Sequence, residues 1–331
     1  MRYKLEFSPY KRNFKQPLKT SHGIWNIREG IILQLTSKTG ETGLGEIAPL
    51  SWFGSETLSE ALDFCHQLPK EITTETIFSI PDNLPTSKFG FESAWENVKQ
   101  VEIEDKEELK KPNFYSALLP GGKAALEIWE HLWEKGSRTF KWKIGVDKIK
   151  TELEIFQQLV KELPREINLR LDANGGLNFE EAKQWLEICE NLNIIEFIEQ
   201  PLPVDKFSEM LELSNSYSTP IALDESVANL SKMQQYYQKG WQGIFVIKPS
   251  IFGSPAELRN FCQSYFIDAV FSSVFETKIG RKAALKLATE LQANLIKNRA
   301  FGFGVTYFFD EDRVYTDFAT NTHMNIDTFL V

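Results

Sequence analysis

Five charged residues recur at nearly even intervals through the second half of the chain. In order they are Lys143, Asp172, Glu199, Asp224 and Lys248, and the intervals are 29, 27, 25 and 24 residues. Three carboxylates that converge in a low-dielectric site repel one another by several kcal/mol per close pair unless a cation lies between them. Carboxylates without His or Cys suit Mg²⁺, or Mn²⁺, better than Zn²⁺. We therefore expect Asp172, Glu199 and Asp224 to bind a divalent metal ion.

Two lysines, Lys141 and Lys143, stand two positions apart. On a strand this spacing puts both on one face. Their repulsion, about 2.5 kcal/mol at an effective dielectric of ~20, predicts a lowered pKa for one of them. A lysine with a lowered pKa can act as a base near neutral pH. The alternative is a solvated strand end that carries two exposed lysines.

Each of the five charged residues lies near the carboxyl end of a short apolar run, and the runs alternate with amphipathic helical stretches. The eight runs are residues 114–120, 140–145, 167–174, 194–202, 220–226, 243–250, 268–277 and 293–304. This alternation is typical of parallel βαβ units. Eight units predict a (β/α)₈ TIM-type barrel, whose active sites lie at the carboxyl ends of the strands. Lys143 and Lys248, four strands apart, would then face each other across the bound ion. A doubly wound open sheet is the second possibility, and it lacks the expected glycine-rich phosphate turn.

The first part of the chain has a different pattern. Residues 3–8, 30–36 and 43–47 read as antiparallel strands, and residues 53–68 have the spacing of a helix. A charged segment, residues 100–112, ends at a proline and marks a domain boundary. We expect an α+β domain over residues 1–112 and the barrel over residues 113–305.

Composition restricts the partners and the compartment. The net charge is −9, which argues against a nucleic-acid or membrane-surface binder. The sequence shows neither an apolar run long enough to span a membrane nor a signal peptide. Three cysteines without metal-binding spacing fit a reducing compartment, so we expect a cytoplasmic protein. The oligomeric state stays open.

Five short motifs resemble the signature of the enolase superfamily, muconate-lactonizing subgroup. They are Lys141-Trp142-Lys143, Leu171-Asp172-Ala173-Asn174, Ile198-Glu199-Gln200-Pro201, Leu223-Asp224-Glu225-Ser226 and Ile247-Lys248-Pro249. The resemblance implies a modified, enolase-like barrel with an N-terminal α+β capping domain, on which the tail, residues 306–331, packs. It also implies that Mg²⁺ holds the carboxylate of a small-molecule substrate while a base removes the adjacent proton, so that an enediolate forms.

Within the subgroup, local details resemble a dehydratase on the route to menaquinone or phylloquinone, which makes a cyclohexadiene carboxylate aromatic. The resemblance implies that Lys143 moves the proton and that Lys248, with Lys141 nearby, stabilises negative charge. The residues expected to bind substrate are Arg170, Ser272, Ser273, Thr20, Ser21 and Asn174. Residues 20–23 and 50–54 resemble loops that close over the substrate.

Three alternative functions are compatible with the sequence. A racemase of N-succinylamino acids would use both lysines as bases, one on each face of the substrate carbon. A Schiff-base aldolase would use one lysine as a nucleophile and would need no metal. A non-catalytic metal-binding barrel would leave the paired lysines without a purpose. A dipeptide epimerase fits less well, because the Asp-x-Asp expected near residues 300–305 is absent.

Overall fold

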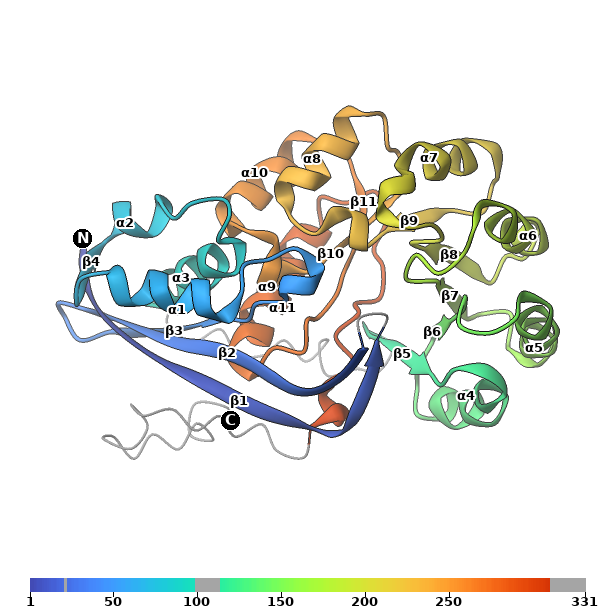
Figure 1. The fold of residues 1–331 in the computed structure, drawn as a ribbon, viewed down its shortest axis with the longest axis horizontal. Helices are drawn as coiled ribbons and strands as arrows, with labels where there is room; N and C mark the ends of the chain where they lie inside the picture. The colour runs from blue at the N-terminus through green and yellow to red at the C-terminus, as the bar shows by residue number, and fades with distance from the viewer. Residues whose placement is uncertain (21–22, 99–113, 310–331) are drawn as a thin grey trace.

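The computed structural model describes residues 1–20, 23–98 and 114–309, and it contains two β-sheets. One is a four-stranded antiparallel sheet in the order β3-β2-β1-β4, and the other is a seven-stranded parallel sheet in the order β11-β10-β9-β8-β7-β6-β5. Figure 1 shows the curled parallel sheet ringed by helices, with the antiparallel sheet (blue) beside it. We call residues 1–20 and 23–98 the cap and residues 114–305 the barrel. The arrangement confirms the predicted barrel with its α+β cap.

The barrel strands arise from the predicted apolar runs. They are β5 (Ser116–Leu119), β6 (Thr139–Lys143), β7 (Asn168–Asp172), β8 (Ile195–Glu199), β9 (Ile221–Leu223), β10 (Ile244–Ile247) and β11 (Asp268–Phe271). The helices between and after them are α4 (Ala125–Glu134), α5 (Ile149–Glu162), α6 (Phe179–Cys189), α7 (Phe207–Ser216), α8 (Leu230–Gln238), α9 (Pro249–Phe252), α10 (Pro255–Ser264) and α11 (Lys278–Gln292).

The eighth run joins the two edges of the parallel sheet through single bridges. Phe301 pairs with Tyr115 beside β5, and Gly302 pairs with Ser272 after β11. The backbone N–H of Phe301 donates to the Phe114 carbonyl at 2.8 Å, and that of Gly302 donates to the Phe271 carbonyl at 2.7 Å. This segment therefore lies between the first and last strands and closes the barrel.

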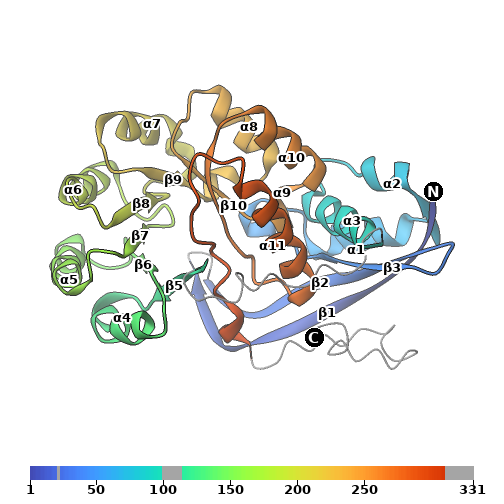
Figure 2. The same cartoon turned by 180° about the vertical axis from the view of Figure 1, so that it is seen from behind.

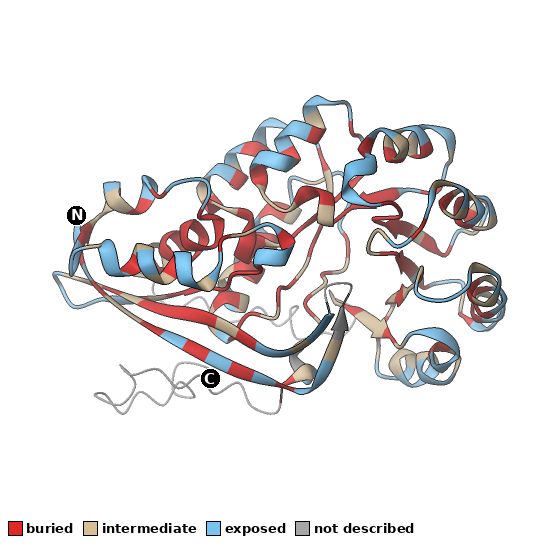
Figure 3. Ribbon diagram, viewed as in Figure 1, coloured by how far each residue is buried: buried red, intermediate tan, exposed pale blue. Residues whose placement is uncertain are grey.

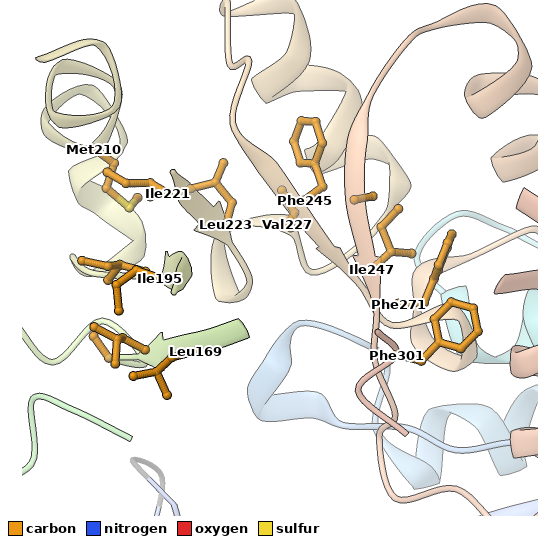
Figure 4. Close-up of a cluster of buried hydrophobic side chains, with 14 of the residues drawn as sticks. Leu169, Ile195, Met210, Ile221, Leu223, Val227, Phe245, Ile247, Phe271 and Phe301 are labelled. Carbon is orange, nitrogen blue, oxygen red and sulfur yellow. The ribbon is translucent and has the colours of Figure 1, made fainter. Parts of the chain in front are cut away.

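Alternation along each strand separates two packing layers. One face packs outward onto the helices: Figure 4 shows Ile221 and Leu223 of β9 on this layer, with Met210 of α7 against Ile221. The other face fills the barrel interior with a second cluster, Phe197, Ala222, Ile244, Val246 and Val270. Each large buried side chain contributes about 1.5–3 kcal/mol. Figure 3 shows the result, with buried strands and helices exposed on their outer sides.

The cap is built on a long hairpin. Its strands are β1 (Arg2–Thr20), β2 (Gly23–Ser37), β3 (Thr42–Ile47) and β4 (Glu71–Thr73). The helices between β3 and β4 are η1 (Ser51–Phe53) and α1 (Leu58–Gln67), and those after β4 are α2 (Thr74–Phe78) and α3 (Pro85–Val98). The three predicted strands are confirmed, although β1 and β2 extend well beyond them. The predicted helix over 53–68 is α1, which starts later because Thr57 and Glu60 form a capping box at its N-terminus.

Helix α3 is not predicted from the sequence pattern. Its residues from Pro85 to Ala94 are all buried, so it lacks the polar face that marks an amphipathic helix. It packs closely on β3, where a Cβ atom on Gly45 would lie 2.0 Å from the Gly90 carbonyl oxygen. Glycine is therefore required at this crossing of helix and strand.

Two predictions about the chain's organisation fall largely outside the described residues. The boundary segment 100–112 lies outside them, as do residues 310–331 of the tail, so the domain limits stay a prediction. Of the tail, η7 (Thr306–Phe308) and Phe309 are described, and the Phe309 ring stacks on Phe14 of β1 with centroids 4.6 Å apart. In the described part of the chain, no helix has the length and apolar character needed to cross a membrane.

Candidate active site

The register of the parallel sheet brings the predicted charged residues into one row. Lys143 pairs with Asp172 across β6 and β7, and Asp172 pairs with Glu199 across β7 and β8. Asp224 directly follows β9, and Lys248 directly follows β10. All five therefore stand at the carboxyl ends of consecutive strands, above the apolar interior cluster.

Lysine side chains bridge these carboxylates. The Lys141 ammonium nitrogen lies 2.6 Å from Asp172 Oδ2 and 2.8 Å from Glu199 Oε1. The Lys248 ammonium group pairs with Asp224. The carboxylates of Asp172, Glu199 and Asp224 are all buried. Two lysine ammonium groups therefore stand among three buried carboxylates at the carboxyl ends of the strands.

Burial and crowding shift the protonation of the acids. Burial, together with the charge of Asp172, raises the pKa of Glu199 to about 8. Burial likewise raises the pKa of Asp224 to about 6, although the Lys248 ammonium group opposes this shift. The site therefore holds more negative charge than the buried space tolerates without further positive charge.

The lowered pKa predicted for one of the two lysines is not found at Lys141. Burial acts to lower the pKa of Lys141, but the Asp172 and Glu199 carboxylates outweigh it and the net pKa is raised. The prediction considered only the repulsion between two lysines on one strand. The carboxylates that reverse it come from the next two strands of the sheet, β7 and β8.

In residues 1–20, 23–98 and 114–309, no three His, Cys, Asp or Glu side chains stand together as a ready-made metal-binding group. The Lys141 ammonium group lies between two of the predicted ligands, because it bonds to both Asp172 and Glu199. The register nevertheless puts Asp172 beside Glu199, and Asp224 follows the next strand of the sheet.

Two residues absent from the predicted site support it. Gln200 is fully buried, and its Oε1 accepts hydrogen bonds from the backbone N–H groups of Asp224 (3.0 Å) and Ser226 (3.1 Å). Glu225 Oε1 accepts a hydrogen bond from Asn174 Nδ2 at 3.1 Å, and burial raises the pKa of Glu225. Both stand inside the sequence motifs, which was the available signal for them.

The cap reaches the site through η1. The Lys248 ammonium nitrogen lies 4.1 Å from the centre of the Phe53 ring. The neighbouring Trp52 ring meets both Phe53 and Trp25 edge to face, with centroids 6.0 and 5.8 Å apart. An aromatic wall from the cap thus covers one side of the charged row, where a substrate would be shielded from water.

The predicted substrate-binding residues are distributed unevenly. Asn174 lies at the charged row, where its backbone N–H donates to Asp172 Oδ1 at 3.1 Å. Arg170 is buried below it, with Nε 2.6 Å from Glu196 Oε2 and a further bond to the Ala300 carbonyl. The structure thus brings Asn174 to the carboxylates and engages Arg170 in a separate ion pair.

Four predicted substrate-binding residues remain: Ser272, Ser273, Thr20 and Ser21. Ser272 and Ser273 follow β11, and the Ser273 hydroxyl donates to Glu276 at 2.8 Å. Thr20 ends β1, where its backbone pairs with Gly23 of β2, and Ser21 lies outside the described residues. The roles of these residues in substrate binding stay predictions.

Comparison with known proteins places this geometry in a family. Residues 124–322 match the enolase C-terminal domain-like family model, and residues 10–98 match the N-terminal domain model of MenC. The chain is 39% identical over 300 residues to o-succinylbenzoate synthase of Thermosynechococcus vestitus, covering 89% of this chain and 90% of that protein. It is 25% identical to L-Ala-D/L-Glu epimerase of Bacillus subtilis, covering 90% and 89% of the two chains.

Solved structures agree with the sequence comparison. The crystal structure of o-succinylbenzoate synthase from Thermosynechococcus elongatus, complexed with Mg in the active site, has a TM-score of 0.86 and 37% identity over 96% of this chain and 98% of that one. The Bacillus subtilis epimerase has a TM-score of 0.74 at 21% identity, over 93% and 91% of the two chains, and shares the fold. The chain therefore belongs to the o-succinylbenzoate synthase family of the enolase superfamily.

Proposed function

We propose that the protein removes water from 2-succinyl-6-hydroxy-2,4-cyclohexadiene-1-carboxylate to give o-succinylbenzoate, in menaquinone or phylloquinone biosynthesis. The observation that carries the proposal is the row of Lys143, Asp172 and Glu199 in register, with Lys248 on a distant strand of the same barrel. The 39% identity to an o-succinylbenzoate synthase over most of both chains supports this choice of substrate.

The residues at the site fit Mg²⁺, with Mn²⁺ as a substitute. Asp172, Glu199 and Asp224 would hold the ion, because all three are buried and offer only oxygen donors. Burial, and next to it the charge of Asp172, raises the pKa of Glu199 to about 8, and a divalent cation beside these carboxylates would favour their charged forms. When bound, the ion supplies positive charge beside the substrate carboxylate, where negative charge develops as the proton leaves.

Lys143 moves the proton. From the end of β6 its amine takes the ring proton next to the substrate carboxylate, which breaks the C–H bond. The electron pair forms the new ring double bond as the C–O bond on the neighbouring carbon breaks, and Lys143 gives the proton to the departing hydroxide. Water leaves and the ring becomes aromatic. Lys143 is half-buried, as a group that must meet both substrate and released water should be.

The other two lysines act through their charge. Lys248 lies between Asp224 and the Phe53 ring, and it stabilises negative charge on the substrate from the side opposite Lys143. Lys141 is tied to Asp172 and Glu199, so its role is to hold those carboxylates and add positive charge next to them. Loss of either amine therefore weakens the transition state more than the binding of substrate.

Polar groups at the rim bind the rest of the substrate. Ser272 and Ser273 follow β11, and we assign them to a substrate carboxylate, for which the Ser273 hydroxyl would exchange its bond to Glu276. Asn174 contributes an amide beside Asp172. We include Thr20, Ser21 and Arg170, as the family resemblance implies, with Thr20 at the end of β1 and Arg170 beneath the row. Single alanine variants measured for KM test each of these assignments.

An absorbance assay for o-succinylbenzoate tests the proposed function. The wild-type protein should form the product with Mg²⁺ and lose activity in EDTA, and Lys143→Ala should not form it. Full activity in EDTA would show that the reaction needs no metal, as a Schiff-base lysine mechanism would not. The absence of turnover by the wild-type protein would overturn the proposal.

Racemisation of N-succinylamino acids is the second candidate, because the site carries amines on two well-separated strands. Proton exchange in heavy water distinguishes it. If Lys143→Ala and Lys248→Ala each abolish exchange of one enantiomer only, the racemase is the correct assignment.

We also propose a cytoplasmic location and a small molecule as the only substrate class. Cys65, Cys189 and Cys262 are buried free thiols, which fits a reducing compartment. The net charge of −9 does not favour a nucleic-acid partner.

A further inference from the structure

A carboxylate of the cap is buried in the barrel where β11 passes into α11. Glu46 of β3 is completely buried. Its carboxylate accepts hydrogen bonds from the backbone N–H groups of Thr277 (3.0 Å) and Gly280 (2.9 Å), and also from the hydroxyl groups of Thr277 and Tyr10. Thr277 is the N-cap residue of α11, and Gly280 lies in the first turn of this helix. Glu46, a residue of the N-terminal domain, therefore accepts hydrogen bonds from the free N–H groups at the start of a barrel helix. Figure 2 shows α11 beside β2 and β3 at this junction.

The residues around Glu46 are shaped to receive it. A Cβ atom on Gly280 would lie 2.7 Å from Glu46 Oε2, so only glycine admits the carboxylate at this distance. Burial, together with the charge of Glu46, raises the pKa of Tyr10 well above its usual value. The Tyr10 phenol therefore stays protonated and remains a donor to Glu46.

Two cap arginines bind the same junction. Arg28 Nε donates to the Val274 carbonyl at 3.0 Å, and an Arg12 guanidinium nitrogen donates to the Glu276 carbonyl at 3.4 Å. The Glu276 carboxylate in turn accepts bonds from the Ser273 hydroxyl (2.8 Å) and the Val274 backbone N–H (2.7 Å). Cap side chains thus hold residues 274, 276 and 277 in sequence.

The backbone within this segment needs such support. Phe275 has φ of 62°, in the left-handed region that non-glycine residues seldom adopt. Its ring packs edge to face on Phe14 and Trp25 of the cap, with centroids 5.5 Å away in each case. The segment begins at Ser272 and Ser273, so its conformation determines where their hydroxyl groups stand.

We propose that Glu46 is a positioning residue for substrate binding. It lies outside the reacting row, and it fixes segment 272–277, so it sets where Ser272 and Ser273 stand. A substrate carboxylate would take the Ser272 hydroxyl directly and the Ser273 hydroxyl on its release from Glu276. This inference rests on the proposed function, because it assigns those serines to the substrate. It makes the cap a direct determinant of affinity for the carboxylate, acting through the last barrel strand.

Glu46→Gln tests the proposal, since it keeps the shape but replaces one acceptor oxygen by an amide group that faces N–H donors. We expect KM for the substrate, and Kd for added o-succinylbenzoate, to rise about tenfold, because a charge-assisted hydrogen bond is lost. We expect kcat to stay within about twofold, because the lysines and carboxylates are untouched.

Glu92→Gln is the matched control. Glu92 is also a buried cap residue, and it accepts a hydrogen bond from the Ala256 backbone N–H at the start of α10, at 3.2 Å. It does not contact segment 272–277 in the described structure. Both variants should lower the melting temperature, but only Glu46→Gln should raise KM.

Hydrogen exchange separates the positioning role from the activity. The amides of Val274 and Thr277 should exchange faster in Glu46→Gln than in the wild-type protein, whatever substrate the enzyme uses. If Glu46→Gln does not fold, Tyr10→Phe removes a single donor and should give a smaller rise in KM, about threefold. A folded variant of either kind with wild-type KM and unchanged exchange overturns the inference, as does an equal rise in KM for Glu92→Gln. Failure of the wild-type protein to make o-succinylbenzoate would instead overturn the proposed function.

Discussion

The ammonium group of Lys248, at the end of β10, lies 4.1 Å from the centre of the Phe53 ring in the cap. The same group pairs with Asp224, so it is held between a carboxylate of the barrel and an aromatic face of the cap. A cation over an aromatic ring gains about 0.5–2 kcal/mol, with the larger value in a desolvated site. The cap therefore takes part in the electrostatics of the site as well as covering it.

Phe53→Leu should lower kcat/KM for o-succinylbenzoate formation by about 2- to 30-fold, because Lys248 loses its aromatic partner. Steady-state kinetics would measure the effect. Trp52→Leu is the matched control, since this neighbour is 41% exposed. A similar loss in both variants would mean that the segment acts only as a cover.

Lys143→Ala should lower kcat by about 10²–10⁴-fold, the usual contribution of a general acid–base group. Product binding, measured by calorimetry, should change little, because the carboxylates and Lys248 remain. Lys148→Ala, at an exposed position before α5, should behave as the wild-type protein does. Substantial turnover by Lys143→Ala would assign proton transfer to another group.

Mg²⁺ should raise the melting temperature of the wild-type protein, by an amount equal to about 2.7 kcal/mol at 100 times its Kd. Asp224→Asn should reduce this shift, because one of three oxygen ligands loses its charge. Differential scanning fluorimetry with and without Mg²⁺ measures this in the absence of substrate. Asp205→Asn, at an exposed position, should retain the full shift, and a full shift in Asp224→Asn would place the metal elsewhere.

The barrel could be predicted because each charged residue ends an apolar run, and parallel strands bring such ends together. The same logic placed Lys143, Asp172 and Glu199 in one row, which the register bears out. Helix α3 escaped prediction for a physical reason, since burial on all sides removes the periodic polar face.

Contacts between residues that lie far apart along the chain could not be predicted from local spacing. The raised pKa of Lys141 depends on Asp172 and Glu199, which lie 31 and 58 residues away along the chain. The hydrogen bond between Glu46 and Thr277 of segment 272–277 likewise forms only through the packing of cap and barrel. The motifs contain Gln200 and Glu225, but the hydrogen bonds through which these two act depend on the folded structure.

Glu152→Gln should disturb the end of β6. The Glu152 carboxylate of α5 accepts hydrogen bonds from the backbone N–H groups of Gly145, Val146 and Asp147, at 2.9, 2.9 and 3.0 Å. This loop directly follows Lys143, so the variant should lose about 1–3 kcal/mol of stability and also lower kcat.

Urea unfolding and steady-state kinetics would measure the two effects of Glu152→Gln separately. Glu154→Gln, on the exposed side of the same helix, is the matched control and should change neither quantity. An unchanged kcat in a destabilised Glu152→Gln would show that the loop supports only the fold.

Glu196 lies at the centre of the ion pairs beneath the charged row. Glu196 lies 2.6 Å from both Arg170 Nε and an Arg299 guanidinium nitrogen. Burial acts to raise the pKa of Glu196, but the two arginines outweigh it and the net pKa is lowered. A depressed pKa in the folded protein stabilises it above the unfolded value, and this contribution disappears as the pH falls through the folded value.

Glu196→Gln should therefore cost about 3–5 kcal/mol at pH 7, because it removes the carboxylate that pairs with the buried Arg170, while Arg299 keeps its pair with Asp268. The difference from the wild-type protein should shrink as the pH is lowered from about 4.3, the ordinary glutamate value, through the lower pKa of the folded state. Urea unfolding between pH 7 and pH 3 would measure it, with the exposed Glu180→Gln as control. A constant difference across this range would mean that the Glu196 charge contributes nothing and that Glu196→Gln acts through packing alone.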